Sequence, residues 1–124
     1  MYKIVFVCLG NLYRSIYAED RFKELASDLD VDVSSTGLLK LESNKKDHLK
    51  RIQDADLILT MEQNQTDFIK NLTSAPTFTL REYTFGDKKD IEIVDPIGGG
   101  NPHYKQDIDE CLQILLEKIK QELK

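Results

Sequence analysis

The sequence has little of what several protein classes require. It contains two cysteines, Cys8 and Cys111, and two histidines, with no tryptophan, among 124 residues. Neither cysteine has a partner at the spacing of metal ligands, so we expect neither a disulfide scaffold nor a metal site. No metal or other cofactor is predicted. The low cysteine content is typical of a protein in a reduced, cytoplasmic setting.

Long apolar runs and an excess of positive charge are also missing. No stretch approaches the ~20 apolar residues of a membrane span, and the short apolar run at the N-terminus does not resemble a signal peptide. The net charge of −5 disfavours general binding to nucleic acids or membrane surfaces. No repeat or low-complexity segment divides the chain. We therefore expect one domain spanning residues 1–124, acting as a monomer.

Two hydrophobic periods alternate along the chain. Short apolar runs are separated by stretches in which apolar residues recur three or four positions apart. Strands are predicted over residues 2–8, 31–36, 56–61 and 78–80, and helices over residues 15–29, 45–54, 66–72 and 104–123. Residues 38–44 have no clear period, and residues 81–102 are predicted to be irregular. This alternation predicts an α/β domain with a parallel sheet and helices on both faces.

The junction of the first strand and first helix carries the candidate chemistry. Its sequence is Val7-Cys8-Leu9-Gly10-Asn11-Leu12-Tyr13-Arg14-Ser15. A loop at a helix N-terminus directs free backbone N–H groups and the positive end of the helix dipole at one point, which binds anions. This field favours the thiolate form of Cys8, and Arg14 can bind two phosphate oxygens. Ser15 is a suitable N-cap for the helix.

Each cysteine can also be interpreted as a buried residue of the hydrophobic core. Cysteine is among the most buried residue types, and a Cys-x5-Arg spacing arises by chance. Cys111 lies on the apolar stripe of the last predicted helix, so we interpret it as a core residue. For Cys8, the combination of strand, Gly/Asn loop, Arg-Ser and helix start favours a phosphate site with a nucleophilic sulfur.

Asp95 is the best candidate for the acid that such chemistry needs. It follows an apolar run and precedes Pro96, which stiffens the backbone, and three glycines follow at 98–100. An Asp-Pro pair also starts turns, and Asp87 and Asp90 are nearby rivals. Cleavage of a phosphate ester needs a proton for the leaving oxygen and a base for the attacking water, so a carboxylate beside the loop is expected.

Residues 7–15 resemble the phosphate loop of the low-molecular-weight protein tyrosine phosphatases, and Val94-Asp95-Pro96 resembles the general-acid loop of that family. The resemblance implies four parallel strands in the order 2-1-3-4. It implies that Cys8, Arg14 and Asp95 are catalytic, with Cys8 forming a phosphocysteine. It also implies that the remaining loop residues bind the substrate, namely Leu9, Gly10, Asn11, Leu12, Tyr13 and Ser15. The expected substrate is a phosphorylated protein or a small phosphoester.

The sequence departs from the family pattern in ways that concern the substrate. Tyr13 stands where most members carry a second cysteine, and residues 37–54 are shorter than usual by about one helix and its loop. The glycine-rich segment after Asp95 and the residues 79–83 resemble the arginine-directed branch of the family. That branch, however, has a threonine at the position of Leu12.

We predict a phosphatase acting on phosphotyrosine or small aryl phosphates. The alternatives are a protein arginine phosphatase of the same family and a non-catalytic module that binds phosphate or phosphopeptides. A phosphocysteine carrier of a sugar phosphotransfer system is a further alternative, but it would need neither Arg14 nor Asp95.

Overall fold

A computed structural model of the chain describes residues 1–42, 46–86, 90–93 and 102–124. Its strands are β1 (Tyr2–Cys8), β2 (Val31–Gly37), β3 (Leu57–Thr60) and β4 (Thr77–Thr79). Its helices are α1 (Arg14–Leu25), α2 (Leu38–Glu42), α3 (Lys46–Asp54), α4 (Gln63–Lys70), α5 (Leu80–Phe85) and α6 (Tyr104–Glu122). The four strands pair in parallel in the order β2-β1-β3-β4, which confirms the predicted fold.

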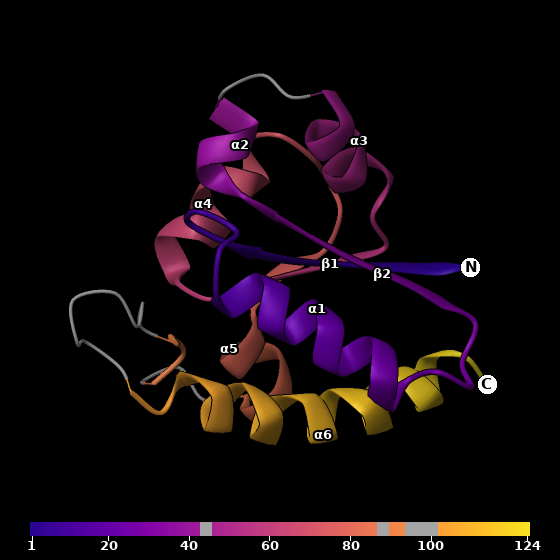
Figure 1. Cartoon of the computed structure of the whole chain (residues 1–124). Coiled ribbons are helices and arrows are strands. Elements are labelled where there is room, and N and C mark those ends of the chain that lie inside the picture. The colour runs from indigo at the N-terminus through magenta and orange to yellow at the C-terminus, as the bar shows by residue number, and fades with distance from the viewer. Residues whose placement is uncertain (43–45, 87–89, 94–101) are drawn as a thin grey trace.

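The two faces of β1 build two hydrophobic cores. Ile4 and Phe6 face one side, where they pack with apolar residues of α1, α5 and α6. Val5 and Val7 face the other side, where they pack with apolar residues of α2, α3 and α4. Figure 1 shows these two groups of helices on opposite sides of the strands. Because both faces of β1 are covered, its near-continuous apolar run is the pattern expected of a central parallel strand.

Two short helices were not predicted. α2 occupies part of the segment without a clear period, and α5 begins at Leu80, the last residue of a predicted strand, and continues into the segment expected to be irregular. The Thr79 side chain caps α5 by accepting a hydrogen bond from the Glu82 N–H at 3.1 Å, and the C-cap after Phe85 is Gly86, whose φ is +70°. The Thr-x-x-Glu pattern followed by glycine is the signal that would have predicted α5.

The boundaries of two predicted helices also differ. α1 ends at Leu25 rather than at residue 29, and α4 begins at Gln63 rather than at residue 66. The side chain of Gln65 accepts hydrogen bonds from the N–H groups of Met61 and Glu62, so the chain starts its helical turn early. No helix in the described ranges combines the length and the apolar character that crossing a membrane would require.

Candidate active site

The loop after β1 curls around the sulfur of Cys8. Asn11 adopts a left-handed conformation with φ of 55°, which asparagine tolerates better than most residues. This turn directs the Asn11 N–H at the Cys8 Sγ, at a distance of 3.2 Å. The loop therefore presents a backbone donor to the sulfur, as the anion-binding interpretation of the sequence requires.

Ser15 connects the sulfur to the strained turn. Its Oγ lies 3.0 Å from the Cys8 Sγ and donates a hydrogen bond to the Asn11 Oδ1 at 2.7 Å. The expectation that Ser15 caps α1 is wrong, because Tyr13 occupies the N-cap position and Ser15 lies inside the first turn. The hydroxyl has a single proton, which here holds the side chain of Asn11, so it stabilises a thiolate by turning that proton toward the sulfur.

Arg14 is buried, with 2% of its surface exposed, and two of its acceptors in the described part of the chain lie far away in the sequence. Its Nη1 donates to the Glu62 Oε2 at 2.7 Å and to the Ile93 carbonyl at 2.7 Å. Glu62 follows β3 and is held in turn by Gln65, whose Nε2 donates to the same Oε2 at 3.3 Å. Sequence reasoning missed Glu62 and Ile93, because neither belongs to a local motif with Arg14.

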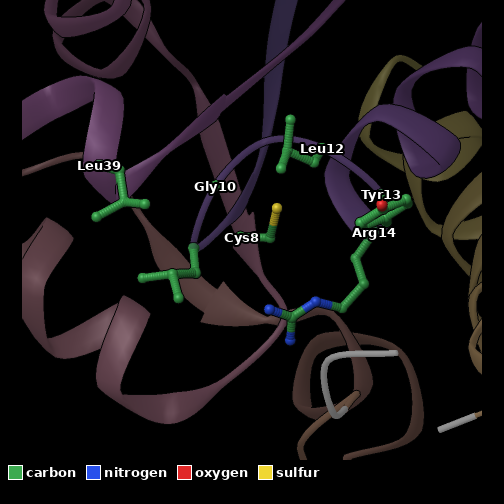
Figure 2. Close-up of a pocket in the computed structure, with 7 residues that line it drawn as sticks. Cys8, Gly10, Leu12, Tyr13, Arg14 and Leu39 are labelled. Carbon is green, nitrogen blue, oxygen red and sulfur yellow. The ribbon is translucent and has the colours of Figure 1, made fainter. Parts of the chain in front are cut away.

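Cys8 and Arg14 meet at a cavity of about 110 Å³. Its lining residues are Cys8, Leu9, Gly10, Leu12, Tyr13, Arg14 and Leu39. Figure 2 shows the Cys8 sulfur at the centre, with Arg14 reaching in from α1 and Leu39 on the other side, in α2. Leu12 is 62% exposed and Leu39 is 54% exposed, so the cavity has a charged base and an apolar rim.

The end of β2 supports the loop from outside. A Cβ atom on Gly37 would lie 2.7 Å from the Asn11 nitrogen and 2.8 Å from the Leu9 oxygen. Two residues later, the Leu39 N–H donates to the Leu9 carbonyl at 3.1 Å. The junction of β2 and α2 therefore contacts the backbone of the loop after β1 directly, and only glycine fits at position 37.

Three further predictions concern Cys111, Asp95 and a metal site. Cys111 is fully buried in the core on the α6 side, as expected, and burial raises the pKa of its thiol to about 11. Asp95 lies outside the described residues. Within those residues, no group of three His, Cys, Asp or Glu side chains has the arrangement of a metal site.

The family model described as "Low molecular weight phosphotyrosine protein phosphatase" matches residues 3–53 and 44–124. The chain belongs to this family. It is therefore a cysteine-dependent phosphatase, and the recognised family and its fold are confirmed.

Relatives of both substrate branches are similar to the chain. A protein-arginine-phosphatase from Bacillus subtilis (strain 168) is 32% identical over 144 residues, covering 95% of each chain. The low molecular weight protein-tyrosine-phosphatase PtpB from Staphylococcus epidermidis (strain RP62A) is 34% identical over 140 residues, covering 95% of this chain and 96% of its own. A solved structure of the YwlE arginine phosphatase, a mutant with a phosphorylated active-site serine, superposes with a TM-score of 0.77 at 26% identity and 95% coverage of each chain.

Proposed function

We propose that this phosphatase hydrolyses phosphotyrosine in proteins, or small aryl phosphates, through a phosphocysteine on Cys8. The observation that carries the proposal is the meeting of the Cys8 sulfur and the Arg14 guanidinium at one cavity with an apolar rim. A phosphate dianion needs the cation and the loop N–H groups, and an aryl ring needs the apolar rim.

The first chemical step is attack by the Cys8 thiolate on phosphorus, in line with the leaving oxygen. The P–S bond forms as the P–O bond breaks, while Arg14 and the loop N–H groups stabilise the equatorial oxygens. Asp95 gives its proton to the leaving phenolate. Support for Asp95 comes from its sequence setting and from Ile93, two positions earlier, whose carbonyl accepts a hydrogen bond from Arg14.

The second step releases phosphate. The Asp95 carboxylate takes a proton from a water molecule, whose oxygen attacks phosphorus as the P–S bond breaks. The electron pair of that bond returns to the Cys8 sulfur, and Ser15, 3.0 Å away, stabilises the departing thiolate. Orthophosphate leaves, and the thiolate is ready for another cycle.

Replacing Asp95 with asparagine tests whether Asp95 is the general acid. The value of kcat/KM for phenyl phosphate, whose leaving group needs a proton, should fall by about 10²–10³-fold. The fall for p-nitrophenyl phosphate should be much smaller, because its leaving group is stable without a proton. Steady-state kinetics on both substrates measures the difference.

Asp87→Asn is the matched control, because Asp87 is a rival carboxylate in the same stretch of sequence. It should leave both substrates unaffected. A loss in this variant that matches the loss in Asp95→Asn would refute the assignment. If turnover of both substrates is unchanged by Asp95→Asn, Asp95 is not the general acid. A wild type that binds phosphate but hydrolyses neither substrate would instead favour a carrier or a binding module.

A protein arginine phosphatase is the second candidate function. Two observations favour it: the similarity to a Bacillus subtilis protein-arginine-phosphatase over 95% of each chain, and the resemblance of residues 79–83 to the arginine-directed branch. Leu12 is evidence against the arginine phosphatase function. An exposed leucine beside the sulfur offers an aryl ring apolar contact but offers no acceptor to the N–H groups of phosphoarginine.

Leu12→Thr is expected to shift substrate preference. We expect the wild type to hydrolyse a phosphotyrosine peptide faster than a phosphoarginine peptide, and the substitution to move the ratio of kcat/KM values by about tenfold toward phosphoarginine. Leu123→Thr, at an exposed leucine near the C-terminus, is the control and should not change the ratio. A wild type that prefers phosphoarginine would make the second candidate the function.

A further inference from the structure

The segment Asp90–Ile93 has no regular secondary structure, yet contacts fix it at both ends. At its start, the Arg81 Nε donates to the Asp90 carbonyl at 2.8 Å. At its end, the Ile93 N–H donates to the Met61 carbonyl at 2.8 Å, and the Ile93 side chain is 1% exposed in the core. These contacts attach the segment to α5 and to the end of β3.

Glu92 adds a contact to the start of α4. Its Oε2 accepts a hydrogen bond from the Gln63 N–H at 2.9 Å. Gln63 is the first residue of α4, where backbone N–H groups have no partner within the helix. A carboxylate is also favoured there by the helix dipole. An exposed glutamate thus supplies the acceptor for the first N–H of α4.

This contact joins the two chain segments that hold Arg14. Arg14 Nη1 has two acceptors, the carboxylate of Glu62 and the carbonyl of Ile93, each at 2.7 Å. Gln63 directly follows Glu62, and Glu92 directly precedes Ile93. The hydrogen bond from Gln63 to Glu92 therefore cross-links the backbone on either side of the guanidinium and fixes the spacing of its two acceptors.

We propose that Glu92 is a positioning residue of this phosphatase, which sets the orientation of Arg14 by cross-linking its two acceptors. The proposal rests on the phosphate-binding role of Arg14 in the proposed function. A guanidinium binds two phosphate oxygens only when its plane is correctly aligned, and small shifts of a positioned group have large effects. Loss of the cross-link leaves the two segments joined through the hydrogen bond from Ile93 to Met61, so Ile93 and Glu62 can shift relative to each other and the alignment of Arg14 is weakened.

The test measures vanadate binding by isothermal titration calorimetry, because vanadate adopts the five-coordinate geometry of the phosphoryl transition state and needs no turnover. Glu92→Ala should weaken binding by about five- to tenfold, the size expected when one hydrogen bond to a charged group is weakened. Glu92→Gln keeps an acceptor oxygen and should restore most of the affinity. Glu117→Ala, at an exposed glutamate on α6, should bind vanadate like the wild type.

A double variant separates positioning from general destabilisation. In the Arg14→Lys background, Glu92→Ala should have no further effect on vanadate binding, since no guanidinium is left to align. A Glu92→Ala variant that binds vanadate like the wild type would overturn the proposal. So would a loss of the same size in both backgrounds, or a loss confined to turnover of phenyl phosphate, which would indicate action through Asp95.

A different experimental result would refute the proposed function. A wild type that binds vanadate but does not hydrolyse p-nitrophenyl phosphate would refute the reaction, while the vanadate measurements on Glu92 would still decide whether it orients Arg14.

Discussion

Replacing Cys8 with serine is expected to abolish hydrolysis of p-nitrophenyl phosphate while leaving the fold intact. A serine hydroxyl is not ionised near neutral pH, so the loop N–H groups have no thiolate to stabilise and the nucleophile is lost. We expect kcat to fall by at least about 10³-fold. The added hydroxyl should not destabilise the protein, because Ser15 Oγ and the Asn11 N–H lie 3.0 and 3.2 Å from the position of the sulfur.

Cys111→Ala is the matched control for this experiment, because Cys111 is the other cysteine of the chain. It is fully buried in the core on the α6 side, so its removal should lower the free energy of unfolding by about 1–2 kcal/mol through lost packing. Its kcat should equal that of the wild type. Turnover that survives Cys8→Ser, or a loss of activity in a folded Cys111→Ala variant, would contradict the assignment of Cys8 as the nucleophile.

Gly37→Ala is expected to reduce kcat/KM by about 10²-fold, although residue 37 contacts no substrate. Its new Cβ would lie 2.7 Å from the Asn11 nitrogen and 2.8 Å from the Gly10 carbonyl carbon. These are backbone atoms, which cannot rotate away as the end of a side chain can. The loop must therefore move, and its N–H groups no longer converge on the phosphate.

Gly86→Ala provides the comparison, because this glycine tests backbone strain without a close contact. Its φ is +70°, so alanine should destabilise the protein by about 1 kcal/mol, but within the described residues no atom beyond its chain neighbours lies within 4 Å of the new Cβ. Thermal unfolding should show a loss of stability in this variant with full activity. If Gly37→Ala retains wild-type kcat/KM, the β2–α2 junction does not hold the loop in its active shape.

Most of the elements predicted from the sequence depend on patterns among residues that are close together in the chain. The apolar runs of β1 and β3, and the apolar stripe of α6, reflect which faces are buried, so their periods predict strands, helices and their alternation. The phosphate loop lies within a few residues between β1 and α1, so its spacing alone indicated a phosphate site. The parallel sheet followed from the alternation, and its strand order from the resemblance to the family.

Short helices show where that reasoning stops. A helix such as α2, with five residues, is too short to display a period, and packing against β2 decides its conformation. Tertiary contacts also decide where Ser15 lies in α1. A serine before an apolar stripe is typical of an N-cap, but Ser15 contacts Cys8 and Asn11 and lies two positions after the N-cap Tyr13.

Only the tertiary structure decided what surrounds Arg14. Glu62 is 48 residues away in the sequence and Ile93 is 79 residues away, and neither has a local pattern that indicates a partner. The parallel order of the strands brings the ends of β1, β2 and β3 to one edge of the sheet, where Gly37 and Glu62 reach the loop. The sequence by itself predicted the candidate nucleophile and the anion-binding loop, because both are local. The folded chain determined how that loop is held, because contacts between distant segments exist only once the sheet has formed.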